Sequence, residues 1–201
     1  MFKEAKIVST KGTILFKSDG TRTKTSTKTE KGSIFEGVIK LKKSEYEEIL
    51  NLSKTIIPPK NVEFFINNVL LKRANNHSVF TETLPTVTVD ESGNFTPTSR
   101  LTEIELFKSL DKNYICELGI PVVETDIPFT INVNQKVPLS KDRDNVKPTY
   151  LKKLKAFVLN QTHTDLSEDE LQTTFAQEAL EQKEATAEAV KSVIDAKFGE
   201  D

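Results

Sequence analysis

The stretch DIPFTINVNQKVPL, residues 126–139, decides the fold class because Ile127, Phe129, Ile131 and Val133 occupy every second position. A period of two is typical of a β-strand. Other stretches share the β-branched residues and flanking turns of strands: residues 1–16, 33–43, 61–74, 86–98 and 113–123. Residues 101–110 and 149–161 fit a helix or a strand. We therefore expect a mainly β fold, an OB-like barrel or a β-sandwich, with a short internal helix and an acidic C-terminal α-helix, α+β overall.

Two hairpins are expected around sequences that favour turns. KSDGTRTKTSTKTEKG, residues 17–32, contains no apolar side chain. We expect it to form a flexible basic loop at the tip of a long β-hairpin whose arms are residues 1–16 and 33–43. A second hairpin is expected to turn at Glu91–Asn94, where Ser, Gly and Asn follow one another.

Residues 44–53 are expected to form the internal helix. Ser44 is placed to cap its N-terminus, and Glu47 follows at the spacing of a capping box. Pro58-Pro59 then forces an extended backbone. The alternation of apolar residues over 61–74 predicts one core strand after the prolines.

The composition changes at Asp165. The chain from there to Phe198 is rich in Ala, Glu, Gln and Lys and contains neither Pro nor Gly, which is typical of a helix. Ser167 and Glu170 form a capping box at its start, and the apolar stripe is stronger in the first half, so we expect that half to be docked and the second half looser. The chain is thus expected to have two parts, a β-rich basic body over 1–160 and an acidic helical C-terminal segment over 161–201.

The distribution of charge along the chain is uneven, although the formal net charge is only -2. Residues 1–160 hold 25 Lys and Arg against 19 Asp and Glu, a net charge of +6. Residues 161–201 hold 3 Lys against 11 acids, a net charge of -8. A basic body with an acidic end indicates a polyanion-binding surface and a segment that competes for it or recruits basic partners.

The sequence lacks the patterns of common enzymes and of bound cofactors. It has no glycine-rich phosphate loop, no G-x-S-x-G and no H-E-x-x-H. His77, His163 and Asp165 have the residue types of a metal or catalytic cluster, but no spacing supports one. Cys116 is alone in an apolar stretch, as a small buried residue would be. We therefore expect a protein that is not an enzyme and binds no metal or cofactor.

Two further expectations concern the compartment. No stretch approaches the ~18 apolar residues that a membrane-spanning helix needs, and the first residues lack the apolar run of a signal peptide. We expect a cytoplasmic protein without a membrane partner.

The candidate binding residues fall into two clusters. The first lies in the loop and the arm that follows it, where Lys side chains reach phosphates and Thr and Ser hydroxyls donate to them: Lys17, Arg22, Lys24, Lys28, Lys31, Lys40, Lys42 and Lys43. The second combines cations with a tyrosine that we expect to be exposed, so that it stacks on bases: Lys72, Arg73, Tyr150, Lys152, Lys153 and Lys155. The alternative without a binding function is that residues 17–32 form a solvated hairpin tip whose charges keep the protein soluble.

The layout of a strand-rich basic body, a basic hairpin and an acidic end with Phe198 resembles phage-type single-stranded DNA-binding proteins. The resemblance covers the charge layout of the whole chain and includes no sequence motif. It implies an OB-fold, a role in coating single-stranded DNA during viral DNA replication, and an acidic segment that modulates binding or recruits replication proteins, with Phe198 entering a partner pocket. This chain departs from the pattern because its end is helical and its acids are spread out.

Two other functions remain open at this point. One is a structural or assembly protein, such as a virion or tail component, which forms a homo-oligomer through its β-rich body and its terminal helix. The other is a regulatory protein that binds its partner through the acidic helix.

Overall fold

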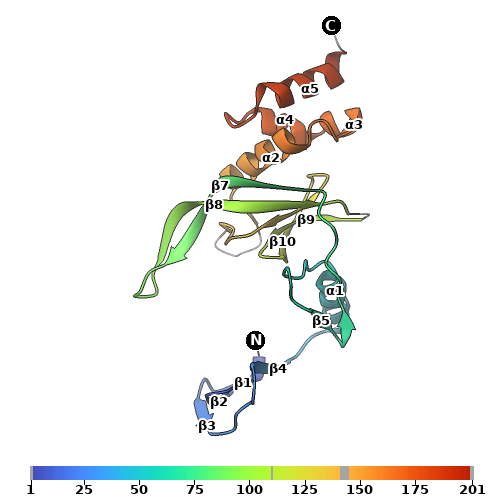
Figure 1. The fold of residues 1–201 in the computed structure, drawn as a ribbon. Helices are drawn as coiled ribbons and strands as arrows, with labels where there is room; N and C mark the ends of the chain where they lie inside the picture. Colours follow the sequence, from blue (N-terminus) through green and yellow to red (C-terminus); the bar gives the residue numbers. More distant parts are fainter. Residues whose placement is uncertain (1, 110, 141–144, 200–201) are drawn as a thin grey trace. The chain divides into compact units, whose positions relative to one another are not determined.

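The computed structural model describes residues 2–109, 111–140 and 145–199 of a mixed α+β chain. It divides the chain into two compact units, the N-terminal unit Met1–Asn51 and the C-terminal unit Leu52–Asp201 (Figure 1).

The N-terminal unit contains a four-stranded antiparallel sheet with the order β3-β2-β1-β4. Its strands are β1 (Phe2–Ser9), β2 (Gly12–Phe16), β3 (Arg22–Thr25) and β4 (Ser33–Ile39). The expected pairing of the two arms is confirmed by the antiparallel contact of β1 with β4, but the single continuous first arm and the flexible tip over residues 17–32 are wrong. Residues 2–16 already form a hairpin, and the loop expected to be flexible contributes β3, whose threonines favour extended backbone.

The chain reaches β3 through a turn at Asp19-Gly20. The Asp19 carboxylate accepts hydrogen bonds from the Thr21 backbone N–H at 2.8 Å and from the Thr21 hydroxyl at 2.6 Å. Gly20 has a φ of 81°, which a residue with a side chain rarely adopts. An Asp-Gly pair that bonds its own backbone is a turn signal, and it sends the chain back alongside β2.

The internal helix α1 (Lys43–Ser53) is present, but it begins one residue earlier than expected. The Lys42 N–H donates to the Glu45 carboxylate at 2.7 Å. Glu45, rather than the expected Glu47, therefore accepts a hydrogen bond from a backbone N–H at the N-terminus of the helix. Ser44 lies inside the helix.

The core strand expected over residues 61–74 is also wrong. Two short strands, β5 (Phe65–Ile66) and β6 (Val69–Leu70), form a tight hairpin there. Asn67 and Asn68 both have positive φ, at 50° and 63°, as a two-residue hairpin turn of this kind requires. None of the alternating apolar residues is buried: Val62 and Leu70 are exposed and Phe64 and Ile66 are half-buried, because the turn divides the segment before a strand of useful length forms.

The C-terminal unit is built on a five-stranded sheet with the order β10-β9-β11-β8-β7. Its strands are β7 (Ser78–Val89), β8 (Phe95–Phe107), β9 (Asn113–Glu117), β10 (Ile120–Thr125) and β11 (Thr130–Val133). All four residues of β11 are buried, and the strand runs parallel to β9 and antiparallel to β8. The sequence that indicated a β fold therefore supplies the central strand.

The hairpin expected at Glu91–Asn94 is confirmed. The Asp90 N–H donates to the Asn94 carbonyl at 3.0 Å between β7 and β8, and the paired strands reach from Val89 opposite Phe95 to Ser78 opposite Leu106. Figure 1 shows this hairpin projecting beyond the rest of its sheet. Within the described residues β10 and β7 do not pair with each other, so the sheet is open and the OB-like barrel is not confirmed.

The C-terminal unit has four helices: α2 (Pro148–Thr162), α3 (Glu168–Leu171), α4 (Thr174–Leu180) and α5 (Ala187–Phe198). Helix α2 lies on one face of the sheet, and the other three lie beyond α2 (Figure 1). Residues 149–161 are thus helical, with Pro148 in the first turn, where its missing N–H costs nothing. Ile131 from the sheet, Leu154 from α2 and Phe175 from α4 belong to the same buried core.

The C-terminal segment is divided into three short helices instead of one long helix. The capping box of Ser167 and Glu170 is confirmed at the start of α3. Thr186 caps α5 through the Ala189 N–H, and Ala189 and Val193 of that helix are buried. No helix in the described part of the chain is long and apolar enough to cross a membrane.

Candidate functional site

One face of the N-terminal sheet combines aromatic, aliphatic and cationic side chains. Residues paired across antiparallel strands point to the same face, and neighbours along a strand alternate. Ile7 pairs with Ile14 and Phe35, and Ile14 pairs with Lys24. We call this side the aromatic face; its larger side chains are Ile7, Ile14, Phe16, Arg22, Lys24 and Phe35.

The aromatic face is accessible. Phe35 is 59% exposed and Ile7 is 38% exposed. The Arg22 guanidinium lies over the Phe16 ring at 5.5 Å from its centroid. Phe16 itself is half-buried, and the cation stacked on its ring offers a flat surface with positive charge at its edge.

The opposite face of the sheet carries the carboxylates of the strands. Lys6 and Glu36, directly paired across β1 and β4, form an ion pair of 2.5 Å there. Val8 and Thr13 are buried on this side, where the Thr13 hydroxyl donates to the Thr27 carbonyl at 2.7 Å. The sheet therefore separates its charges, with the acids on one face and Arg22 and Lys24 on the other.

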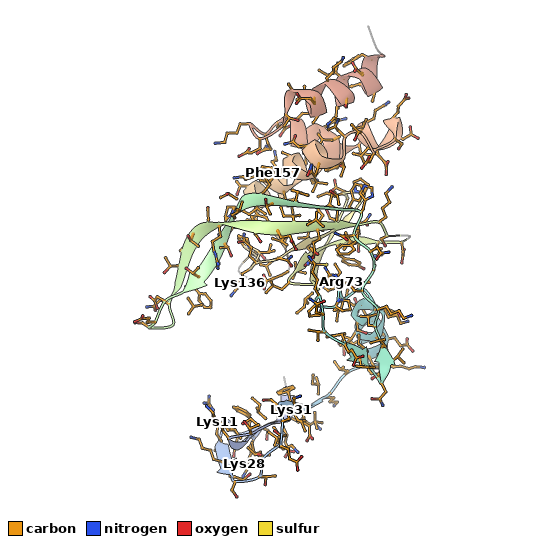
Figure 2. The ribbon with its side chains drawn as sticks, viewed as in Figure 1. Lys11, Lys28, Lys31, Arg73, Lys136 and Phe157 are labelled. Atoms are coloured by element: carbon orange, nitrogen blue, oxygen red, sulfur yellow. The ribbon has the colours of Figure 1, made fainter. Side chains whose placement is uncertain are left out.

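More cations lie in the loops that connect the strands of the N-terminal sheet. Lys11 lies in the β1–β2 turn, Lys17 follows β2, and Lys28 and Lys31 lie between β3 and β4; all four are exposed. Figure 2 shows Lys11, Lys28 and Lys31 on the N-terminal unit. Within the described residues no carboxylate pairs with any of these lysines.

Asp19 reduces this positive charge locally. The Thr21 hydroxyl and the Thr21 backbone N–H hold the pKa of Asp19 below its usual value, with a smaller effect of nearby Lys17. The carboxylate therefore stays ionised at neutral pH beside Lys17.

A shallow depression of about 230 Å³ lies between Lys11 and Lys24. Its other lining residues are small, hydroxylated or aliphatic: Ser9, Gly12, Thr13, Ile14 and Thr25. Gly12 has a φ of 140°, and a Cβ there would lie 3.1 Å from the Thr25 carbonyl oxygen. Two ammonium groups beside a small hydroxylated depression suit an oxyanion such as a phosphate.

Lys40, Lys42 and Lys43 do not belong to the sheet. They lie between β4 and α1 or at the start of α1, and Lys43 forms an exposed ion pair of 3.8 Å with Glu47. Lys72 is exposed in the C-terminal unit.

Arg73 is part of a polar clamp in the C-terminal unit. Its Nη2 donates to both carboxylate oxygens of Glu105 at 2.7 Å, and Nη1 donates to the Pro58 carbonyl. Lys60 and Asn132 also bind Glu105, at 3.0 Å and 2.8 Å. Glu105 is 1% exposed, and a cavity of about 360 Å³ adjoins the clamp.

The clamp explains the charge state of Glu105. Burial alone would raise the pKa of this carboxyl group, but the hydrogen bonds from Asn132, Arg73 and Lys60 outweigh it and lower the pKa. The clamp ties the segment that follows Pro58 to β8 and β11, so Arg73 is engaged with its own chain (Figure 2).

The lysines of α2 are likewise neutralised by the acidic C-terminal segment and by Asp126. Lys155 is 4% exposed in its side chain and binds Asp126 at 2.8 Å and Glu178 at 3.0 Å. Lys152 binds Glu181 at 2.8 Å. Lys153 lies 3.6 Å from Glu184 and 5.4 Å from the centroid of the Phe157 ring. Figure 2 shows Phe157 on α2, between the sheet and the outer helices.

The expectation that Tyr150 is exposed is wrong. It is 2% exposed, and burial raises the pKa of its hydroxyl well above the usual value. It lies in the first turn of α2, and the helix turns this side chain into the core. The second predicted cluster therefore does not form a basic groove.

Of the remaining candidates, the structure brings His77 and Asp165 into contact. Phe198 is 76% exposed at the end of α5, with Lys197 over its ring. His77 binds Asp165 at 3.1 Å and stacks on Phe129, whereas His163 binds Ser192 at 2.8 Å. In the described ranges no group of three His, Cys, Asp or Glu side chains is placed to hold a metal ion.

Comparison with known proteins gives no match, whether to protein families, to characterised proteins or to solved structures.

Sequence reasoning identified Arg22 and Lys24 but missed Lys11, Ile14 and Phe16. Their proximity depends on the register that pairs Phe16 with Arg22 and Ile14 with Lys24. One signal was available: the Asp19-Gly20 turn implies that the chain returns alongside residues 12–16.

Proposed function

We propose that this protein is a non-enzymatic nucleic-acid-binding protein that holds single-stranded nucleic acid, most naturally DNA, on the aromatic face. The observation that carries this proposal is the separation of charge across the N-terminal sheet. Phe16, Phe35 and Arg22 share a face with Lys24, while the strand carboxylates lie on the other face. Single-strand binding needs this combination of rings for bases and cations for the phosphate chain.

The aromatic and the cationic residues have different roles in this proposal. The rings of Phe16 and Phe35 stack on bases, which is tolerant of sequence because every base has a flat face. Lys11, Arg22 and Lys24 each neutralise one backbone phosphate, with Lys11 and Lys24 beside the depression, and Lys17, Lys28 and Lys31 attract the strand from the margins. This role does not require an OB-like barrel, because an open four-stranded sheet also presents stacking side chains to a single strand.

The acidic C-terminal segment has a different part in this proposal from the one suggested by charge alone. Glu178, Glu181 and Glu184 bind the lysines of α2. They thereby complete the C-terminal unit and keep a second basic surface from attracting nucleic acid. Phe198 remains the residue proposed to contact a replication or assembly protein.

The test is binding of a fluorescent oligothymidine to the full-length protein over a range of salt concentrations. The affinity should fall linearly with salt on logarithmic axes, since each neutralised phosphate of a single strand contributes a slope of about 0.7. Arg22→Ala with Lys24→Ala should reduce the slope by about 1.4, and the matched pair Lys183→Ala with Lys191→Ala should leave it unchanged. Lys183 and Lys191 are exposed cations of the C-terminal unit.

Phe16→Leu separates stacking from charge. The substitution keeps an apolar side chain but removes the ring, so the affinity should fall by about fivefold or more while the salt slope stays the same. Absence of binding, or binding that added salt does not weaken, would contradict the proposed function.

The second candidate function is a structural or assembly protein that self-associates through its β-rich part. It is favoured by the large apolar side chains exposed in the N-terminal unit: Ile7, Ile34, Phe35, Val38, Ile39, Leu41, Tyr46 and Ile49. A soluble monomer rarely exposes so many apolar side chains in one small unit. Large particles in light scattering, with no oligonucleotide binding, would favour this candidate.

A further inference from the structure

β4 is an open edge of the N-terminal sheet. It is the terminal strand in the order β3-β2-β1-β4, and all seven of its residues are exposed. Within the described residues its outer side pairs with no strand. Its large side chains are Ile34, Phe35, Val38 and Ile39. An exposed apolar edge of this length is a template for another strand.

The other edge of the same sheet is protected. β3 has four residues, and Arg22 and Lys24 are two of them. Short edges with cationic side chains resist pairing with further strands. On β4 the corresponding protection is absent, because the charge of Glu36 is already paired with Lys6 on β1.

The N-terminal unit also lacks a core of its own. Among its described side chains only Val8 and Thr13 are buried. A sheet normally becomes stable by burying one face or by extending itself until several strands share that task. The unit therefore has more to gain from a partner strand than the C-terminal unit, whose sheet is already covered by α2.

The sequence of β4 is suited to a second copy of itself. In Ser33–Ile39 the apolar pair Ile34-Phe35 and the apolar pair Val38-Ile39 lie on either side of Glu36-Gly37. An antiparallel copy reverses the strand, so a residue of one apolar pair, Phe35, can lie opposite a residue of the other pair, Ile39. A partner of unrelated sequence would have to supply that symmetry by chance.

We infer that β4 pairs antiparallel with β4 of a second copy of this chain, with the two-fold axis at Gly37. Opposed residues must share a face, so the axis passes through a residue position. An axis at Glu36 would set two carboxylates directly opposite each other, which is unfavourable. An axis at Phe35 would leave two large apolar residues, Val38 and Ile39, beyond the end of the partner strand, whereas the axis at Gly37 leaves only one, Ile34.

The axis at Gly37 uses the apolar residues best. It places Phe35 opposite Ile39 twice and Val38 opposite Glu36 twice. Aromatic and β-branched residues are a favourable cross-strand pair. The two sheets become one eight-stranded sheet, with both aromatic faces on the same side. This last consequence lengthens the binding surface only if the proposed function holds, whereas the pairing itself does not depend on it.

The first test is sedimentation velocity of the full-length protein without nucleic acid, over a wide range of concentration. The protein should approach a dimer as the concentration rises. Phe35→Lys with Ile39→Lys places charges at the paired positions and should leave only monomer. Leu101→Lys is the matched control, because Leu101 is an exposed leucine of β8 in the other unit, and it should leave the dimer intact.

A cysteine experiment fixes the axis and does not depend on the stability of the lysine variant. Under mild oxidation Gly37→Cys should form a disulfide-linked dimer, since the two thiols face each other at the axis. Ser33→Cys should not, because the two copies of that position lie about 27 Å apart along the paired strands. The native Cys116 is buried with its pKa raised to about 12, so it does not compete.

Three results would overturn the inference: a wild-type protein that stays monomeric, a double-lysine variant that still dimerises, or a cross-link at Ser33→Cys as efficient as that at Gly37→Cys. None of them depends on whether the protein binds oligonucleotides. A monomer that binds an oligonucleotide would therefore overturn the dimer and leave the proposed function standing.

Discussion

In the C-terminal unit the lysines of α2 and the side chain of Arg73 are held by carboxylates of the same unit, whereas Lys11, Arg22 and Lys24 of the N-terminal unit have no carboxylate partner within the described residues. Both sets come from stretches that look equally basic in the sequence. The difference teaches that a run of lysines indicates a binding surface only when the fold leaves those lysines unpaired. Paired cations stabilise a fold, and unpaired ones on an exposed sheet are available to a ligand.

The largest expected effect is on the polar clamp. Arg73→Met removes the bidentate partner of the buried Glu105 and should lower the free energy of unfolding by about 3 kcal/mol, since an uncompensated buried charge is costly. Urea denaturation followed by circular dichroism measures this. Lys72→Met changes the exposed neighbour and should have no measurable effect. Equal losses in the two variants would contradict the distinction between paired and unpaired cations.

The clamp should also make stability depend on pH in a definite direction. The pKa of Glu105 is lowered in the folded protein, because three hydrogen-bond donors outweigh the effect of burial. A depressed carboxyl pKa stabilises the fold above the unfolded pKa of about 4.3 and loses that contribution as pH falls through the folded value.

The measurement is the urea midpoint at a series of pH values from neutral to acid. In the wild type the urea midpoint should decrease as the pH is lowered below about 4. In Glu105→Gln the urea midpoint should be lower at neutral pH and should decrease less on acidification. Identical pH profiles for the two proteins would show that another carboxyl group is responsible.

A smaller effect is expected at α2. Lys155→Met should cost about 1–2 kcal/mol, because the lysine is buried and loses two charged hydrogen bonds, while its partners Asp126 and Glu178 remain partly solvated. Lys152→Met breaks an exposed pair and should change the urea midpoint little or not at all. Equal destabilisation of the two variants would show that burial of the ion pair does not determine its contribution to stability.

The sequence predicted the fold class and several local features, and the reasons for the failures are physical. The alternation of Ile127, Phe129, Ile131 and Val133 predicted a strand, and β11 (Thr130–Val133) contains the last two of these residues. Ser167 with Glu170 identified a helix start because a capping box is local. The prediction of one strand over 61–74 was wrong because Asn67-Asn68, which permit positive φ at two successive residues, are a hairpin signal.

The site was harder to predict because it depends on pairings between distant residues. Tyr150 and Lys155 look exposed beside other polar residues, but the helical period of α2 turns both inward. The partners of the α2 lysines lie more than 20 residues away in the chain. On the N-terminal sheet only the register brings Arg22 to Phe16 and Lys24 to Ile14. Counting charges along the sequence does not reveal which of these distant residues lie next to each other.

The smallest expected effect on stability, and the sharpest test of the comparison, is at Lys11. The side chain is exposed in the β1–β2 turn and borders the depression shared with Lys24. Lys11→Ala should leave the urea midpoint unchanged, because the lysine has no ion pair to lose within the described residues. It should reduce the salt slope of oligothymidine binding by about 0.7, the contribution of one phosphate contact. Lys183→Ala, an equally exposed lysine of the C-terminal unit, should change neither quantity. If both variants left the slope unchanged, Lys11 would not contact a phosphate, and its freedom from an ion pair would reflect solvation alone.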